Sequence, residues 1–334
     1  MHASPMRVTA AALSLACLAG AGFDAAASAS FPGRNGRIVF EVRSVAGRED
    51  PCFTPSCQES RLGAVAPRGG RRLPFDPCTD PVECEDRDPA IAPGGGRIAF
   101  ERLSYSGEPL PLDFPDLEYL AVTRLRGARV RLLAEPARDP AWAPSGRWIA
   151  FARDDGIYRI RPDGRGLRRI VEGSAHELDW SVRGVLVFTR YRRLRSDLYT
   201  VRPDGSGLRR LTRDGGSREA SWSPDGRSLV HLRLVFVKGE IEPRRLDLVI
   251  RRGGDAPIRV GSGVAPVWSP DGSRLAFIRR NSIWTMSTAG TSARRLIGLG
   301  ERNYVGSPAW RPVPERRGRY SRASTTIAPN KSAR

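Results

Sequence analysis

Four acidic residues recur at one position of a repeated sequence pattern. The pattern centres on a large apolar residue, usually tryptophan, and the position three residues before it holds Asp88, Asp139, Glu177, Glu219, Ala265 and Ser307 in the six copies. Hard cations such as Ca2+ prefer oxygen ligands. If the six copies form a ring, the four carboxylates surround one mouth of its central channel, where they could bind Ca2+ or a basic group of a partner peptide.

A structural role is the alternative for the same four residues. Each carboxylate could instead accept hydrogen bonds from backbone amides, or pair with a neighbouring arginine such as Arg87, Arg138 or Arg218. The sequence leaves both roles open.

Catalytic motifs are absent from the rest of the sequence. The chain has 3 histidines, His2, His176 and His231, which is poor support for a metal-dependent lyase. No G-x-S-x-G nucleophile elbow, G-x-G-x-x-G fingerprint or P-loop occurs. We therefore expect a protein that is not an enzyme. A glycan-active lyase or hydrolase is the alternative, with the channel-mouth carboxylates and His176 as its working groups.

The cysteines and the N-terminus indicate export. Residues 1–29 have the features of a secretory signal peptide, with Arg7, an apolar run over residues 8–22 and the small-x-small sequence at 27–29. An uncleaved anchor is the alternative. We expect a secreted, periplasmic or envelope-associated protein.

Four cysteines follow the predicted signal peptide, Cys52, Cys57, Cys78 and Cys84. An even number in an exported chain favours disulfides, and the local pairings 52–57 and 78–84 are preferred among three possible connectivities. The spacings fit a zinc site less well, because such sites use C-x-x-C steps. Cys17 lies within the apolar run of the signal peptide.

The formal net charge of +19 comes mostly from arginine. The segment after Pro312 contributes +5, which leaves about +14 on the body of the chain. Outside the membrane the available polyanions are lipid headgroups and wall polymers, so a partner that is an anionic envelope polymer is possible and nucleic acid is not expected. A solvated arginine-rich surface is the simpler interpretation.

The repeats predict the fold. Successive anchor positions, from Ile91 to Trp310, are 51, 38, 42, 46 and 42 residues apart, which is typical of a stacked or circular array. Each copy has an apolar strand, a Pro-Asp-Gly-like turn and an alternating strand, and a second hairpin such as residues 157–170 follows. Four antiparallel strands per copy predict an all-β propeller with four-stranded blades.

The two ends of the repeat region supply half a blade each. The strand at residues 35–42 has no tryptophan strand before it, and residues 307–312 have no strands after them. Joining the halves would leave no open sheet edge. We therefore predict a six-bladed propeller over residues 31–312, closed by pairing of the C-terminal strand with the N-terminal blade, and a basic, disordered tail over 313–334. The repeated tryptophans are expected to pack between blades rather than to bind sugars.

The repeat P-x-W-S-P-D-G-x-x-L-A-F followed by Y-x-V-R-P-D-G-x-G-x-x-R-L-T resembles the TolB-like, or WD-like, propeller repeat. The resemblance is specific over residues 139–170, 198–230 and 265–296 and looser over 88–133 and 177–188. TolB works in the periplasm with an outer-membrane lipoprotein and carries an α/β domain before its propeller. Only a few residues separate the predicted cleavage site from the first strand, so the resemblance covers the propeller and not that domain.

Together these features predict an exported, non-catalytic propeller that acts as a protein-binding or scaffolding module at the cell envelope. Three stretches interrupt the repeat pattern, at residues 43–61, 74–87 and 104–117, and each falls between two strands. Loops carry function more often than the scaffold does, so these insertions are a candidate partner surface or tolerated decorations. No segment after the signal peptide is long and apolar enough to span a bilayer.

Overall fold

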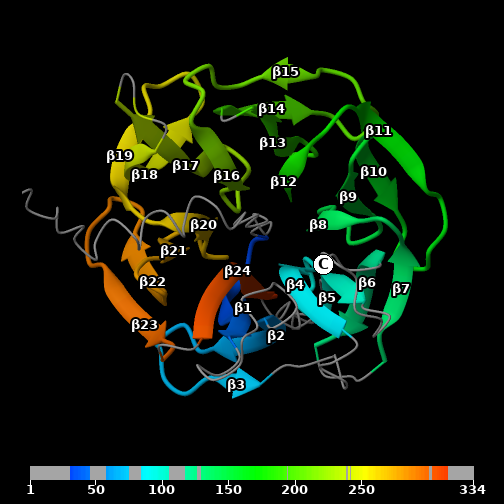
Figure 1. Cartoon of the computed structure of the whole chain (residues 1–334), viewed down its shortest axis with the longest axis horizontal. Helices are drawn as coiled ribbons and strands as arrows, with labels where there is room; N and C mark the ends of the chain where they lie inside the picture. The colour runs from blue at the N-terminus through cyan, green and yellow to red at the C-terminus, as the bar shows by residue number, and fades with distance from the viewer. Residues whose placement is uncertain are drawn as a thin grey trace, which may run out of the picture.

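The fold comes from a computed structural model, which describes residues 31–45, 58–74, 84–104, 117–125, 129–193, 195–237, 240, 242–300 and 303–314. In these residues the chain forms strands and turns. They are arranged as six four-stranded antiparallel sheets around a central axis (Figure 1). The prediction of an all-β, six-bladed propeller is confirmed.

The first three sheets are called blades 1 to 3, and their strands are given from the axis outward. Blade 1 contains β24 (Asn303–Val313), β1 (Arg34–Val45), β2 (Gln58–Val65) and β3 (Leu73–Pro74). Blade 2 contains β4 (Cys84–Ile91), β5 (Arg97–Ser104), β6 (Leu117–Arg124) and β7 (Arg131–Ala134). Blade 3 contains β8 (Arg138–Trp142), β9 (Ile149–Arg153), β10 (Gly156–Ile160) and β11 (Arg168–Glu172).

The last three sheets are blades 4 to 6. Blade 4 contains β12 (His176–Trp180), β13 (Leu186–Arg192), β14 (Arg195–Val201) and β15 (Arg209–Arg210). Blade 5 contains β16 (Ser217–Trp222), β17 (Ser228–Phe236), β18 (Pro243–Arg252) and β19 (Ile258–Ser262). Blade 6 contains β20 (Val264–Trp268), β21 (Arg274–Ile278), β22 (Ser282–Ser287) and β23 (Arg294–Gly298).

The Pro-Asp-Gly turns make the first hairpin of a blade. In blade 5, the Gly226 amide donates to the Ser223 carbonyl over 2.8 Å, and Gly226 has a φ of +66°. That left-handed conformation favours glycine because other residues meet steric strain there. The Ser223 hydroxyl also donates to the Asp225 carboxylate over 2.6 Å. The turn residues therefore fix the hairpin register from within the repeat itself.

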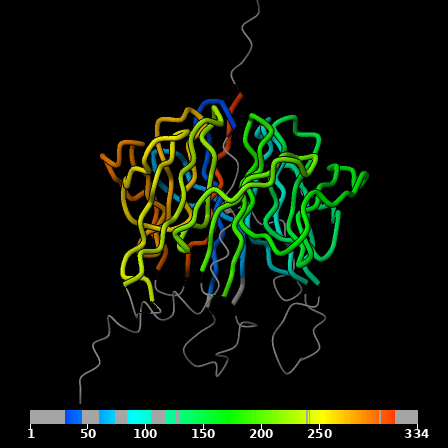
Figure 2. Tube along the Cα trace, turned by 90° about the horizontal axis from the view of Figure 1, so that it is seen from above, coloured from blue at the N-terminus to red at the C-terminus, as the bar shows by residue number. Residues whose placement is uncertain are grey.

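The ring closes by pairing of the two ends of the repeat region. Strand β24 is antiparallel to β1, with Ile38 opposite Trp310 and Val39 opposite Ala309, and β1 pairs with β2 on its other side. In Figure 2 the blue N-terminal strand and the red C-terminal strand run side by side through the ring. The predicted closure is therefore confirmed, and blade 1 is assembled from both ends.

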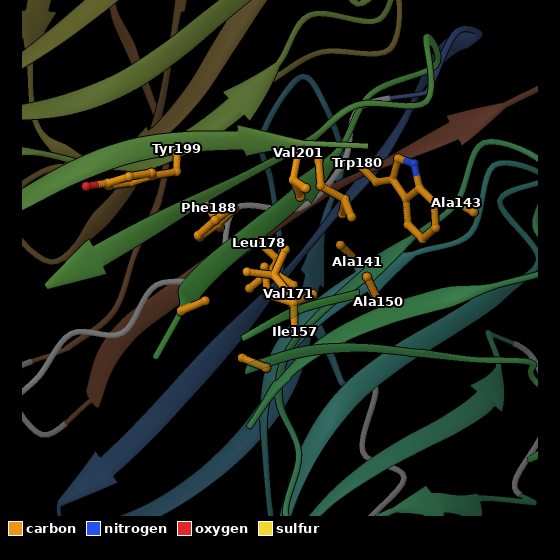
Figure 3. Packing of buried hydrophobic residues seen from close by; sticks show 13 residues of the cluster. Ala141, Ala143, Ala150, Ile157, Val171, Leu178, Trp180, Phe188, Tyr199 and Val201 are labelled. Atoms are coloured by element: carbon orange, nitrogen blue, oxygen red, sulfur yellow. The ribbon is translucent and has the colours of Figure 1, made fainter. Parts of the chain in front are cut away.

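The core lies between neighbouring blades. Figure 3 shows Trp180 of blade 4 against Ala141 and Ala150 of blade 3. The Trp142 indole donates to the Ala90 carbonyl of the preceding blade over 3.0 Å, and the Trp268 indole does the same to Ser221 over 3.1 Å. The repeated tryptophans therefore pack between sheets, as predicted.

Several predicted features lie outside the described residues. These are the signal peptide over 1–29, residues 315–334 of the tail, and Cys17, Cys52, Cys57 and Cys78. Cys84 begins β4 and is disulfide-bonded. The choice between the possible pairings stays a prediction. Most residues of the three insertions also lie outside the described residues. The strands that flank the insertions end on the same face of the ring, because successive connections of an antiparallel blade alternate between its two faces.

In the part of the chain that the structure describes, no helix is long and apolar enough to cross a membrane.

Closure can be tested by truncation. A chain ending at Gly300 lacks β24, which leaves the β1 edge unpaired and removes Val305 and Trp310 from the core shared with blade 6. We expect its thermal unfolding to lose its sharp, cooperative transition. A chain ending at Pro314 keeps β24 and should unfold like the full-length protein. Equally sharp and equally stable transitions in the two truncated chains would contradict closure by β24.

Candidate functional site

The predicted site residues lie at a kink that every inner strand shares. The antiparallel register of each inner strand shifts at an equivalent point, which marks a β-bulge, and β24 has a second shift nearer its C-terminal end. The residues at this point have left-handed φ angles, 47° at Asp88, 52° at Asp139, 55° at Glu177, 53° at Glu219 and 51° at Ala265. In β24 the shift falls at Gly306 and Ser307. A bulge re-aims a side chain, so the repeat turns six equivalent side chains out of the regular pleat.

These side chains point to the next blade. The Glu177 carboxylate accepts a hydrogen bond from the Glu219 amide over 2.8 Å. The Glu219 carboxylate accepts one from the Ala265 amide over 2.6 Å. The Ser307 hydroxyl donates to the Asp88 carboxylate over 2.5 Å. At these three junctions, between blades 4 and 5, 5 and 6, and 1 and 2, the bulge position of one blade therefore bonds to the bulge position of the next and links the inner strands.

The four carboxylates are enclosed rather than open to the channel. Their relative exposure is 3% for Asp88, 1% for Asp139, 0% for Glu177 and 1% for Glu219. Among the described residues, no group of three or more His, Cys, Asp and Glu side chains is arranged to hold a metal ion. For Glu177 and Glu219 the contacts match the capping alternative from the sequence. Calcium binding stays a prediction.

The arginines that precede the carboxylates have several partners. Arg218 lies 3.8 Å from the Glu219 carboxylate. Arg138 pairs with Asp154 and lies 3.5 Å from Glu118. Arg87 pairs with Glu85 over 2.6 Å. Arg218 therefore places compensating positive charge beside the buried Glu219 carboxylate, which a buried carboxylate requires.

Glu177 has additional partners that the sequence did not indicate. The hydroxyl groups of Thr189 and Tyr191 each donate to its carboxylate over 2.6 Å. The His176 ring packs edge-on against Tyr191, with 5.2 Å between centroids, and its Nε2 lies 3.1 Å from the Ser174 hydroxyl. His176 therefore lies beside the bulge, as its position in the repeat predicted, but the contacts are those of packing and local hydrogen bonding.

Glu101 is a further buried acid beside the site. It lies on β5 opposite Arg87 and is 6% exposed. Burial, together with the charges of Asp88 and Asp139, raises the pKa of Glu101 well above its usual value. The sequence did not single it out because it lies on a second strand, away from the repeated anchor.

Asp179 is a second buried acid that the sequence analysis missed. Its carboxylate accepts a hydrogen bond from the Trp222 amide of the next blade over 2.5 Å. Burial raises its pKa to about 8, against hydrogen bonds that act in the opposite direction. The sequence contained a signal for Asp179, because the residue directly before the anchor is Ala90, Ala141, Ser221, Val267 or Ala309 in the other five copies. An acid among small and apolar residues marks a special contact.

Comparisons with known proteins identify the fold. No protein-family model matches the chain, and no curated protein matches it. Among solved structures, TolB from Acinetobacter baumannii superposes with a TM-score of 0.64 and 18% identity, covering 83% of this chain and 67% of that chain. A structure of the nidogen/laminin complex gives a TM-score of 0.61 and 12% identity, covering 83% of this chain and 99% of that one.

A protease structure is also similar. The tricorn protease superposes with a TM-score of 0.54 and 11% identity, covering 81% of this chain but 27% of that chain. At these identities the similarity establishes the shared propeller fold alone. It agrees with the TolB-like repeat recognised in the sequence.

The linking role of Glu219 can be tested by substitution. Glu219→Ala leaves the buried Ala265 amide without its acceptor and should lower the free energy of unfolding by about 1–3 kcal/mol. Glu219→Gln keeps an acceptor oxygen and should be milder. Denaturant melts with and without excess calcium chloride separate the two roles. A calcium-dependent rise in wild-type stability that is lost in Glu219→Ala would support the cation site instead.

The raised pKa of Asp179 predicts a pH dependence. Because its pKa rises from 3.8 in the unfolded chain to about 8 in the fold, the native state keeps a proton that the unfolded state releases. Its contribution to stability is therefore lost as pH rises through this window, by about 1.4 kcal/mol per unit at most. Asp179→Asn keeps an acceptor for Trp222 and does not titrate. Its stability relative to wild type should increase from pH about 5 to pH about 8.

Asp204 provides the matched control for this measurement. It is exposed on a turn, and hydrogen bonds from Ser206 hold its pKa below its usual value. The stability difference between Asp204→Asn and wild type should therefore be flat over the same pH range. A flat difference for Asp179→Asn as well would show that Asp179 is ionised in the fold.

Proposed function

We propose that this chain, a propeller with the fold seen in TolB, is an exported, non-catalytic binding module at the cell envelope, and that its partner is a protein with an acidic surface. The observation that carries the proposal is the charge of the outer strands. The rim is defined as the six outermost strands, β3, β7, β11, β15, β19 and β23, which lie farthest from the axis in Figure 1.

The rim is almost uniformly basic. Its six strands contain eight arginines and one acid, Glu172. One register position on these strands holds Leu73, Arg131, Arg168, Arg209, Ile258 and Arg294 around the ring. The arrangement therefore places positive charge at repeated intervals around the outside of the molecule.

Part of this charge is free for a partner. Arg169, Arg210 and Arg259 pair with acids of their own blades over 3.5, 2.6 and 2.7 Å. By contrast, Arg131, Arg168 and Arg209 make no ion pair with any described residue, and all three are exposed. Arg168 and Arg209 directly precede the paired residues Arg169 and Arg210 in the sequence. Their guanidinium groups can therefore bind carboxylates of another molecule.

Exposed apolar side chains accompany the arginines. Leu132, Leu167, Leu208 and Ile258 are 48%, 48%, 47% and 51% exposed, and each lies on or beside an outermost strand. A mixed surface of leucine and arginine suits an acidic protein surface better than a hydrophilic polymer. Charge on edge strands also prevents edge-to-edge aggregation, but acids would serve that purpose equally. Binding of an acidic partner explains why the charged residues of the rim are almost all positive.

Location at the envelope rests on two supports. The predicted signal peptide over residues 1–29 indicates export. The sequence resemblance and the shared fold connect the chain to TolB, which works in the periplasm.

A channel-mouth enzyme acting on glycans is the second candidate. It is favoured by Glu101, whose raised pKa beside Asp88 and Asp139 is the arrangement in which one carboxyl acts as an acid and another stays ionised. Activity of the purified protein on polysaccharides, lost in Glu101→Gln, would support it over a purely binding role.

The rim predicts which substitutions abolish binding. The partner is first captured from envelope extract by the wild type and then purified. We expect the triple variant Arg131→Gln, Arg168→Gln, Arg209→Gln to bind this partner at least about tenfold more weakly than the wild type does, which corresponds to ~1.4 kcal/mol. The affinity should also fall as salt increases. Surface plasmon resonance with the purified pair measures both effects.

The control removes the same charge from one face of the ring. Arg37, Arg147 and Arg227 are exposed and lie off the rim. Replacing these three by Gln should change the affinity by less than about twofold. Equal losses in the two triple variants would show a general charge effect, and capture of an anionic polymer alone would replace the protein partner.

A further inference from the structure

A cavity opens where the first and last blades meet. The seam pocket is defined by its lining residues, Asn35, Ala66, Pro67, Arg68, Arg274, Ser292 and Arg294, and has a volume of about 720 Å³. Asn35 and residues 66–68 belong to blade 1, whereas Arg274, Ser292 and Arg294 belong to blade 6. The pocket therefore lies at the junction made by ring closure, outside the ring of bulge residues.

The lining is strongly basic. Three of its seven residues are arginines, Arg68, Arg274 and Arg294, and none is acidic. Guanidinium groups bind oxyanions through paired N–H donors. A pocket of several hundred Å³ with a few convergent polar groups is of the size that small molecules occupy. The composition thus points to a small, highly charged anion.

Two of the arginines are held in place by their own blades and by the seam. The Arg274 Nη2 donates to the Thr285 hydroxyl over 3.3 Å and to the Ser292 carbonyl over 3.2 Å. The Arg294 Nη2 donates to the Pro67 carbonyl of blade 1 over 3.4 Å. These bonds use one nitrogen of each guanidinium, which leaves the other donors for a ligand. Arg68, the third lining arginine, is exposed.

An acid beside the pocket is already engaged. Asp271 accepts hydrogen bonds from the Asn35 side chain over 2.8 Å, the Ser269 hydroxyl over 2.6 Å and the Ser273 hydroxyl over 2.8 Å. Because its oxygens are occupied by these donors, Asp271 orients Asn35 in the wall of the pocket. It is not one of the lining residues.

A glycine in blade 1 allows its backbone to lie close to blade 6 beside the seam pocket. Gly69, in the turn that carries Arg68, has a φ of +85°, and a Cβ there would lie 3.0 Å from the Leu296 carbonyl of blade 6. Glycine therefore allows the turn to reach the edge of blade 6 and to bring Arg68 near Arg294.

The combination of arginines is particular to this junction. Trp148 and Ser228 hold the position of Arg274 in blades 3 and 5. In blade 2, Arg97 and Arg131 hold the positions of Arg274 and Arg294, but the facing turn of blade 3 has Asp163 where blade 1 has Arg68. In blades 3 and 4, Arg168 and Arg209 hold the position of Arg294, but neither blade has an arginine at the position of Arg274. The seam pocket is therefore more than a consequence of the repeat.

We propose that the seam pocket binds the phosphoryl group of a phosphomonoester. A dianion matches a pocket lined by three arginines better than a carboxylate does, and arginine forks fit its oxygens. Arg294 belongs to rim strand β23, but the proposed site goes beyond the proposed protein binding, because it recognises a small group rather than a partner surface. Because the pocket spans blades 1 and 6, its ligand also binds across the closure and stabilises the folded ring.

Calorimetric titration with glycerol 2-phosphate at constant ionic strength tests the proposal. Inorganic phosphate and acetate are titrated in parallel, to separate a monoester from a free phosphate and from a simple carboxylate. We expect saturable, one-to-one binding of glycerol 2-phosphate, at least about tenfold weaker binding of acetate, and a rise in Tm on saturation.

The double variant Arg68→Gln, Arg294→Gln should bind glycerol 2-phosphate at least about tenfold more weakly than wild type. Its matched control is Arg168→Gln, Arg209→Gln, which removes the same charge at the register position of Arg294 in blades 3 and 4 and should change the affinity less than about twofold. Equal losses in the two variants, or no saturable binding by wild type, overturn the proposal. The rim triple variant should retain phosphate binding, so the two proposals fail independently.

Discussion

Pairing of β24 with β1 is the interaction on which the rest of the structure depends. Five blades are continuous in sequence, but blade 1 takes its inner strand from the end of the repeat region and its other three from the start. Without this pairing, blade 1 would lack its inner strand, and the core shared with blade 6 would lose Val305 and Trp310. Trp310 and Ile38, which are opposite each other, bury their side chains in the core shared with blade 6. The seam pocket exists only because these blades meet.

A second constraint acts at the axis. Left-handed φ angles cost about 1–2 kcal/mol for residues other than glycine, yet Asp88, Asp139, Glu177, Glu219 and Ala265 all have one. The bulge turns the side chain sideways, and the hydrogen bonds to the next blade, seen at Glu177 and Glu219, offset the strain. Buried carboxylates with amide partners are stable where isolated ones are not. The same repeated feature therefore explains why acids occur at the centre of a basic protein.

Charge is consequently separated by radius. Acids at the bulges are enclosed and bonded between blades, and arginines dominate the outermost strands. The rim strands, with eight arginines and one glutamate, contribute +7 to the net charge of +19, and the arginines among them that make no ion pair with any described residue are exposed to other molecules. An enclosed acidic centre and an exposed basic rim favour binding at the outside of the ring over chemistry in its channel.

The sequence alone determined the fold class, the six blades, the closure and the place of the tryptophans, because turn residues and strand periodicity repeat in each copy and act locally. It also singled out the bulge residues by their spacing from the anchor. Tertiary structure decided what these residues do, since a carboxylate can bind a cation or an amide depending on which backbone lies next to it. Glu101, Asp179 and the seam pocket needed the structure for the same reason. Their properties come from burial and from neighbours on other strands, such as Asp139 for Glu101, Trp222 for Asp179 and Arg294 for Arg68.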